Sequence, residues 1–194
     1  LAVPSNGLDA VKMLRTSVRE AYEHGRIVVF IEPIALYMLK DLHVAKDSKW
    51  SFKYPNPKEE IPLGEFGEYG EGKKLIIISY GNGLYLSLQA KKEIEEKINN
   101  KIKVIDLRWL SEINVNKLLD SFGNCRKILI VDECRRNGCH AEGLMSELLS
   151  ETKKPLNIRI HAAENSFIPI GKASTVTLPS KESIIKHSLE LINE

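Results

Sequence analysis

The sequence predicts an α/β protein whose open, mainly parallel sheet is covered by helices on both faces. Short runs of branched apolar residues recur without polar alternation, which is typical of strands that are buried on both sides. Single helical patterns separate these runs, and strands joined by single helices pair in parallel through right-handed crossovers. The expected strands lie at 27–31, 75–78, 102–105, 127–131 and 156–160.

Five helices are expected between and around these strands. In residues 5–24 the apolar positions recur every three or four residues, so they line one side of a helix that Gly25 can end. Asn114 and Ser180 are expected N-caps, and Gly123 is an expected stop. The other helices are expected at 84–98, 115–122, 141–149 and 184–192.

Composition excludes several classes of protein. The 194 residues are 43% hydrophobic and 28% charged, and 28 Lys and Arg against 26 Asp and Glu give a net charge of only +2. This balance argues against a nucleic-acid or membrane surface, and no apolar run approaches the roughly 20 residues of a membrane helix. Three cysteines favour a reducing compartment over a disulfide framework, so a cytoplasmic location is expected, or the mitochondrial matrix if the source is eukaryotic.

The first sixty residues differ from the rest. One helix and one strand cannot bury a core alone, so they are expected to pack on something mostly outside this chain, which begins at Leu1 and reads as a piece of a longer protein. Residues 41–62 then interrupt the pattern. Pro55 and Pro57 stiffen this stretch, and Trp50, Phe52 and Tyr54 are possible anchors, which together predict an ordered linker.

The turn from Tyr80 to Gly83 is one candidate site. Glycines between a buried strand and a helix let a phosphate approach the helix N-terminus, and Asp106 ends the next strand, where a ribose-binding acid would stand. However, Leu86 occupies the position of the third glycine in the dinucleotide pattern. A tight strand-to-helix turn is therefore favoured over a nucleotide site.

Cys134, Cys139 and His140 are a second candidate. They could be three metal ligands, but no second ligand pair exists and two arginines stand between the cysteines. Cys134 and His140 could be a nucleophile and its base, but no residue is identified that would orient them. A free, reduced cysteine pair at a strand end is favoured.

A third candidate lies at the carboxyl end of the strand at 127–131. Open α/β sheets place functional residues at this edge, and arginine is common in subunit contacts. Both a subunit interface and a simple surface salt-bridge cluster remain open here. The candidate interface residues are Glu133, Arg135, Arg136, His140 and Glu142.

The order of several short motifs resembles a known family. Val3–Ser5, Asp9–Ala10, Phe30–Pro33 and Leu36–Tyr37 resemble the end of the pyrimidine-binding domain in the beta part of 2-oxo acid dehydrogenases. The segment that opens the family's C-terminal domain is matched by Pro62–Gly64, and its closing stretch by Ser166–Pro169 and Leu178–Ser180. Between them, in the family's order, stand Tyr80–Gly83, Val104–Leu110, Val131–Glu133 and Ala141–Gly143.

This resemblance implies a division of the chain. Residues 1–40 would be the tail of a truncated pyrimidine-binding domain, 41–62 the ordered linker, and 63–194 a transketolase-type C-terminal α/β domain. The linker with Trp50 looks most like proteins in which the alpha and beta parts are fused. One departure is that Cys139 and His140 stand where the family often has two glycines.

The resemblance also implies a function. The parent enzyme would use thiamine diphosphate and magnesium, held by other domains, to decarboxylate a 2-oxo acid and pass the acyl group to a lipoyl arm. This chain would help build the dimer and dock the lipoyl acyltransferase component. We therefore expect no catalytic, cofactor-binding or metal-binding residue in this chain. Its partners would be the alpha-type part or N-terminal domains of the same enzyme and a second beta copy, with no nucleic acid and no membrane.

Two alternatives stay open at this point. The chain could be a free-standing α/β domain that binds a nucleotide or small ligand at the Gly81–Gly83 turn, or a transketolase-type C-terminal domain in the narrower sense. The sequence does not specify which 2-oxo acid a parent enzyme would use.

Overall fold

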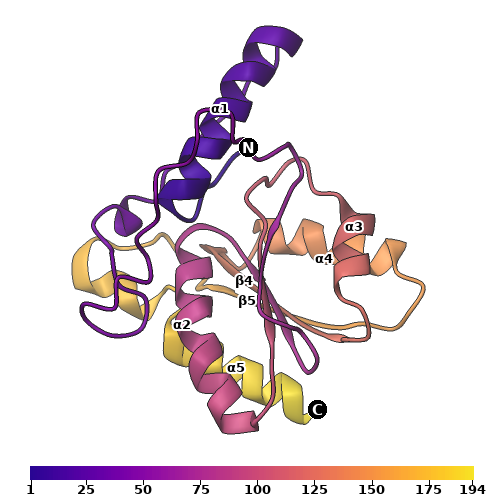
Figure 1. The fold of residues 1–194 in the computed structure, drawn as a ribbon. Helices are drawn as coiled ribbons and strands as arrows, with labels where there is room; N and C mark the ends of the chain where they lie inside the picture. Colours follow the sequence, from indigo (N-terminus) through magenta and orange to yellow (C-terminus); the bar gives the residue numbers. More distant parts are fainter.

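The computed structural model describes residues 1–194, and its centre is a five-stranded sheet in the order β1-β3-β2-β4-β5 (Figure 1). Strands β3, β2, β4 and β5 pair with one another in parallel, whereas the edge strand β1 pairs with β3 antiparallel. The fold class expected from the sequence is confirmed. The strands are β1 (Gly67–Tyr69), β2 (Ile76–Ser79), β3 (Lys103–Asp106), β4 (Lys127–Arg135) and β5 (Asn157–Ala163).

Helices cover both faces of this sheet (Figure 1). On one face α2 (Gly81–Ile98) and α5 (Lys181–Asn193) pack together, and on the other lie α3 (Val115–Ser121) and α4 (His140–Glu151). Successive residues of a strand point to opposite faces, so Ile77 belongs to the first core while Ile76 and Ile78 belong to the second. All three are completely buried, which explains why this strand has no polar alternation.

The predicted helix ends agree closely with the structure. Asn6 caps α1 (Gly7–His24) by accepting a hydrogen bond from the Asp9 amide, and Gly25 ends it with φ 65°. Asn114 caps α3 in the same way, and Ser180 forms a capping box at the start of α5. These ends are local features, because each depends on a hydrogen bond that spans only three residues.

The predicted strand at 27–31 is wrong. The segment is extended, but its only bridges join Phe30 to Ala2, and Ile27, Val29 and Ile31 are 95%, 56% and 46% exposed. A strand requires a neighbour along its length, and within this chain only Ala2 is available. The apolar composition of this run predicted that its side chains would be buried. The rest of the chain leaves Ile27, Val29 and Ile31 exposed.

The sequence also missed some short elements. Strand β1 escaped notice because it has three residues and contains no apolar run. The 3-10 helices η1 (Ile34–Leu36) and η2 (Gly171–Val176) were likewise not predicted. No helix is both long enough and apolar enough to span a membrane.

Residues 41–62 follow a fixed path over α2. The Trp50 ring is buried and meets Tyr85 edge-on, with the ring centres 5.1 Å apart. Asp41 and Asp47 accept hydrogen bonds from backbone amides within this stretch, so its turns hold themselves together. Tyr85 and Gln89 of α2 donate to two of its carbonyl oxygens at 2.7 Å.

The first helix rises out of the α/β layers, and its C-terminal half stands clear of them (Figure 1). Its base is attached through a small core that includes Met13 and Trp109. Asp9, which is buried, forms an ion pair with Arg108 at 2.9 Å. Residues before and after the linker are therefore joined by both apolar packing and charge.

Candidate functional site

The carboxyl ends of β2 and β4 lie where the direction of the crossovers reverses. The chain leaves β2 for β3 on one side and returns from β3 to β4 on the other side of β2. In open α/β sheets such a point forms a crevice that binds ligands. Here Tyr80 Oη donates to Asp132 at 2.7 Å, and Asn82 Nδ2 donates to Glu133 at 2.7 Å. These side chains tie the two strand ends together across the crevice.

Asp132 organises this edge of the sheet. Its carboxylate is buried and accepts hydrogen bonds from Tyr80 Oη, the Cys134 amide (2.8 Å) and the Ala141 amide (3.0 Å). The last of these comes from the first turn of α4, where free amides favour a negative charge. Asp132 therefore connects β2, β4 and α4. The sequence offered one signal for this role, an acid at the carboxyl end of a buried strand.

The structure brings together only some of the five predicted interface residues. Arg136 pairs with Glu142 at 2.8 Å, and Glu142 also accepts a hydrogen bond from the Gly138 amide, so it holds the loop before α4. Arg135 is exposed. His140 meets the Tyr80 ring edge-on, with centres 6.2 Å apart. The fifth residue, Glu133, contacts Asn82 instead of the arginines.

Burial shifts the pKa values of two of these residues. It raises the pKa of Glu133, against the opposing effect of the Asn82 hydrogen bond. It also lowers the pKa of His140, whose Nε2 is buried without a hydrogen-bond partner. Burial therefore favours the neutral imidazole of His140, and its unpaired Nε2 is enclosed by the chain itself.

The glycine turn is not open to a phosphate. The Gly81 amide donates to Ser5 Oγ at 2.9 Å, and Val3 and Pro33 lie against Gly81. The chain's own first residues thus cover the start of α2. Asp106 is completely buried below them. These contacts favour the tight turn over the nucleotide site.

The cysteines form no recognisable reactive centre. Cys134 is exposed and Cys139 is buried. Burial of its sulfur and the nearby Asp132 charge raise the pKa of Cys134, which keeps the thiol protonated. No three His, Cys, Asp or Glu side chains are placed to hold a metal ion. Val3, Ser5 and Pro33 cover the start of α2, so the glycine turn does not fit a pyrophosphate.

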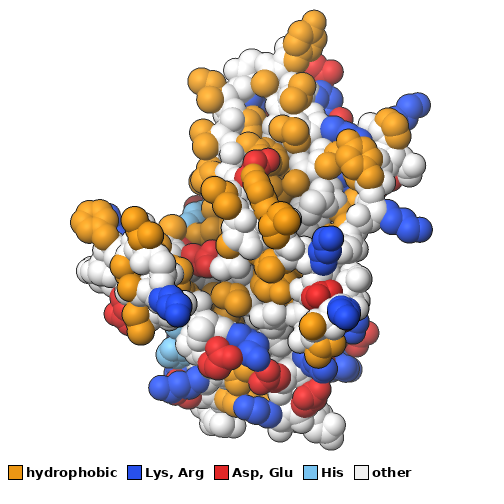
Figure 2. Space-filling model, turned by 90° about the vertical axis from the view of Figure 1, so that its left-hand side faces the viewer, with side chains coloured by type: hydrophobic (Ala, Val, Ile, Leu, Met, Phe, Trp, Pro, Cys, Tyr) orange, Lys and Arg blue, Asp and Glu red, His pale blue; other side chains and the backbone are white.

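The molecule also presents two unpartnered apolar features. Leu14, Val18 and Tyr22 are spaced four apart on α1 and are 50%, 62% and 92% exposed; we call them the α1 apolar face. Figure 2 shows hydrophobic side chains distributed over the projecting upper part of the molecule. The second feature is the segment 27–31, in which only one edge is hydrogen-bonded, through Ala2.

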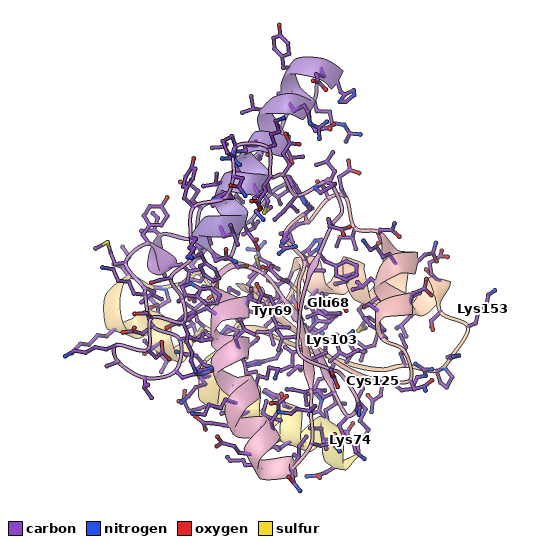
Figure 3. The ribbon with its side chains drawn as sticks, in the orientation of Figure 1. Glu68, Tyr69, Lys74, Lys103, Cys125 and Lys153 are labelled. Atoms are coloured by element: carbon purple, nitrogen blue, oxygen red, sulfur yellow. The ribbon has the colours of Figure 1, made fainter.

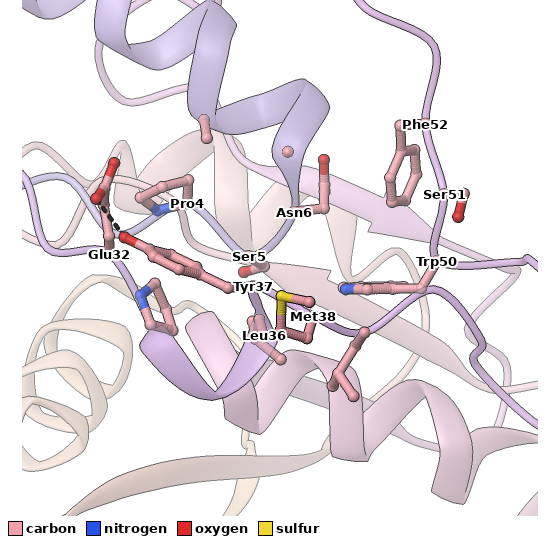
Figure 4. A pocket seen from close by; sticks show the side chains of 14 residues that line it. Pro4, Ser5, Asn6, Glu32, Leu36, Tyr37, Met38, Trp50, Ser51 and Phe52 are labelled. Carbon is pink, nitrogen blue, oxygen red and sulfur yellow. Dashed lines mark hydrogen bonds between the residues drawn. The ribbon is translucent and has the colours of Figure 1, made fainter.

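A cavity of about 570 Å³ lies beside the base of α1 (Figure 4). It is lined by residues 4–7 and 10, residues 32–33 and 36–39, and residues 50–52. In Figure 4, Tyr37 and Trp50 stand on opposite sides of Met38, and Glu32 accepts the Tyr37 hydroxyl proton in a hydrogen bond. Of the 14 residues that line the cavity, 7 are hydrophobic.

Comparison with known families identifies the larger part of this fold. The family model described as the transketolase C-terminal domain matches residues 66–178, which is more than half of the chain and includes the whole sheet. This chain belongs to the transketolase C-terminal domain family. The crevice between β2 and β4 lies within the matched residues.

The sequence relatives of this transketolase-type domain are beta chains. It is 29% identical over 196 residues to the pyruvate dehydrogenase E1 component subunit beta of Staphylococcus aureus (strain N315), covering 99% of this chain and 55% of the relative. The corresponding Staphylococcus epidermidis (strain ATCC 12228 / FDA PCI 1200) subunit is 29% identical over 192 residues, covering 97% and 54%. The chain thus spans about half the length of these curated relatives. The resemblance predicted from motif order is confirmed.

A solved structure shares the fold. A split gene transketolase, described as an inactive beta4 tetramer, superposes with a TM-score of 0.61 at 18% identity, over 71% of this chain and 44% of that chain. This likeness concerns the fold alone. The division at residues 40 and 62 and the roles of the five interface residues stay predictions.

Proposed function

We propose that this chain is an assembly and docking region of a thiamine-dependent 2-oxo acid dehydrogenase and has no complete active site of its own. The parent enzyme would decarboxylate a 2-oxo acid and transfer the acyl group to a lipoyl arm. The similarity to pyruvate dehydrogenase E1 beta subunits supports this class of enzyme. The cover of the glycine turn by Val3, Ser5 and Pro33 supports a pyrophosphate bound elsewhere.

One observation carries the assembly role. The segment 27–31 is extended and apolar, but only one of its edges is paired, and the α1 apolar face beside it in sequence has no cover. Monomeric proteins rarely leave such features unpartnered, because a free strand edge and contiguous apolar surface promote association. A sheet from the N-terminal part of a beta-type chain would pair with this edge, and its helices would cover α1.

The carboxyl edge of the sheet would serve a second contact. Arg135 is exposed and forms no ion pair, so a partner can add hydrogen bonds to it without breaking existing ones. Arg136 and Glu142 give the loop a fixed shape, and Glu133 anchors its base. We assign this edge to the second beta copy or to the lipoyl acyltransferase component.

The absence of a complete site is tested by calorimetry. Thiamine diphosphate with magnesium is titrated into the 194-residue chain, and we expect no saturable heat. The same sample is assayed for decarboxylation of pyruvate and of a branched-chain 2-oxo acid, and no turnover is expected. Tight binding or turnover by the chain alone contradicts the proposal.

The assembly role is tested by reconstitution with an alpha-type chain and the N-terminal part of a beta-type chain. Activity is expected only in the complete mixture. Replacing Val18 and Tyr22 together by Lys places charge on the α1 apolar face and should weaken assembly by about tenfold or more. Ile170→Lys is the matched control, since Ile170 is 99% exposed but lies outside this face. Equal assembly of both variants contradicts the role of α1.

A transketolase-type activity is the second candidate, supported by the family assignment and the shared fold. The sequence relatives favour the dehydrogenase. Assaying the reconstituted mixture for ketol transfer between sugars separates the two candidates.

A further inference from the structure

A basic cavity lies at the opposite end of the sheet from the crevice. It has a volume of about 670 Å³ and lies beside the amino ends of β2 and β4 and the C-terminal ends of α2 and α5. No Asp or Glu lines it. Five of its ten lining residues are cationic, and we call it the lysine cleft: Lys73, Lys74, Lys97, Arg126 and Lys127.

Two of these cations already have structural partners. Lys127 Nζ donates to the Ile192 carbonyl at 2.6 Å, near the end of α5. Arg126 donates to the carbonyls of Gly123 and Cys125 at 2.9 and 2.7 Å. Both contacts satisfy exposed carbonyl oxygens, so these two side chains have a role without any ligand.

The other three cations do not have such partners. Lys97 is in none of the chain's ion pairs, whereas Lys91 and Lys101 pair with Glu95 and Lys103 pairs with Glu68. Lys97 stands in the last turn of α2, where a positive charge is favourable. Lys73 and Lys74 form no ion pair and precede β2 in a loop, so neither has a structural reason to face the cleft. In Figure 3, Lys74 lies over the C-terminal half of α5, whereas Lys153 projects from the far side of the molecule.

We propose that the lysine cleft binds a small anion that carries two or more phosphate groups. Like charges gathered around one hollow repel each other, and a multivalent anion relieves this repulsion at several lysines at once. The cations come from separate segments, so an extended chain of phosphates reaches more of them than a single phosphate does. The cavity volume lies within the range of small-molecule sites.

Calorimetry with inorganic tripolyphosphate tests this site on the 194-residue chain. We expect saturable one-to-one binding that weakens as salt is raised. Replacing Lys73 and Lys74 together by Gln should weaken it by about tenfold. Replacing Lys153 and Lys154 by Gln is the matched control, because these are also adjacent, exposed and without ion pairs, but they do not line the cleft. The control should bind within about twofold of the parent chain.

Two outcomes would overturn the proposal. One is the absence of saturable heat at millimolar tripolyphosphate, and the other is equal weakening by both lysine pairs, which indicates nonspecific charge attraction.

A parallel titration with ATP and with adenosine distinguishes the source of the ligand. Binding of ATP similar to that of tripolyphosphate indicates that phosphates suffice, and tighter binding of ATP indicates that the nucleoside adds contacts. Equal binding of adenosine contradicts phosphate recognition. All variants change exposed side chains, so an unchanged thermal midpoint verifies that each is folded.

Discussion

Two buried carboxylates lie in the sheet, Asp106 at the end of β3 and Asp132 within β4, but their surroundings differ. Asp132 receives three hydrogen bonds, including one from the start of α4. Asp106 receives one long bond, from the Arg108 amide at 3.3 Å, and its Oδ2 has no hydrogen-bond partner. Burial with few hydrogen-bond donors therefore disfavours the anionic form of Asp106.

Replacing Asp132 by Ala should lower the free energy of unfolding by roughly 2–4 kcal/mol, because one buried and two partly buried donors lose their acceptor. Replacing Glu142 by Ala should cost about 1 kcal/mol or less, since its pair with Arg136 is half-exposed. Urea unfolding measures both. A cost for Asp132→Ala no greater than that for Glu142→Ala would contradict the organising role of Asp132.

Asp106 makes stability depend on pH. Burial, reinforced by the nearby Asp9 and opposed by Arg108, raises the pKa of Asp106 from 3.8 to about 7. Between these values the folded chain keeps a proton that the unfolded chain releases, so its contribution to stability falls as pH rises through this window. We expect Asp106→Asn to remove this fall, measured by urea unfolding from pH 4 to pH 8.

His161 changes stability with pH in the opposite direction to Asp106. The pH dependence of the parent chain must therefore be compared with that of Asp106→Asn. Burial, with His187 beside it, lowers the pKa of His161 from 6.5 to about 4. Stability from this group is complete above pH 6.5 and is lost as pH falls toward 4. The difference between the parent chain and Asp106→Asn isolates the carboxyl group. A difference that does not change with pH would refute the assignment.

At the scale of elements, the close contact between α2 and β2 depends on one glycine. A Cβ atom on Gly83 would lie only 2.4 Å from Ser79 Oγ, which donates to the Val131 carbonyl at 2.9 Å. The start of α2 can therefore approach β2 only where no side chain intervenes. The third-glycine position of a dinucleotide fold is occupied by Leu86, so this contact, and not a phosphate, accounts for Gly83.

Gly83→Ala should destabilise the chain by roughly 1–3 kcal/mol, because the added carbon overlaps a buried hydroxyl that cannot move freely. Gly143 in α4 is the matched control. Nothing lies within 4 Å of its ideal Cβ, so Gly143→Ala should stabilise by about 0.5–1 kcal/mol through helix propensity. Thermal unfolding distinguishes the two signs, and a neutral Gly83→Ala would show that α2 can shift.

Trp50 is the principal anchor of residues 41–62. Its ring packs on Tyr85 and Phe52, so Trp50→Ala should cost about 3–5 kcal/mol and loosen this stretch. Limited proteolysis followed by mass spectrometry should show faster cleavage within 41–62. Tyr54→Ala is the control, as Tyr54 is 78% exposed and its ring lies 5.7 Å from the Arg15 guanidinium in a cation–π pair. Equal cleavage of both variants would contradict the anchor.

At the scale of the whole molecule, Arg108 joins the first helix to the α/β layers. It adopts φ 61°, its guanidinium passes over Gly67, and its Nε donates to Asp9 at 2.9 Å. Both side chains are largely buried. The left-handed backbone directs this side chain toward α1, and the absence of a side chain at Gly67 leaves room for it.

Arg108→Met should cost roughly 3–5 kcal/mol, because it leaves the Asp9 carboxylate buried without its partner. The double variant Asp9→Leu with Arg108→Met should recover a large part of this loss, since it removes the orphaned charge as well. Urea unfolding of both single variants and the double variant completes the cycle. Additive losses would mean that the pair does not couple the two parts.

The sequence by itself determined the central fold. Four of the five expected strands and all five expected helices form within a few residues of their predicted bounds. Strand runs such as 127–131 are buried on both faces, and caps such as Asn114 and Ser180 depend on neighbours three residues away. These signals are local, and the parallel sheet follows from their alternation.

Only the tertiary structure decided which of these residues meet. The apolar run at 27–31 has the composition of a strand, but strand formation depends on a partner that the run itself does not encode. Asp132 accepts a hydrogen bond from Tyr80, and Glu133 accepts one from Asn82, because residues 52 and 51 positions apart converge at one sheet edge. Hydrogen bonds of this kind depend on distance in space, so spacing along the chain predicts where functional side chains gather but not which of them bind each other.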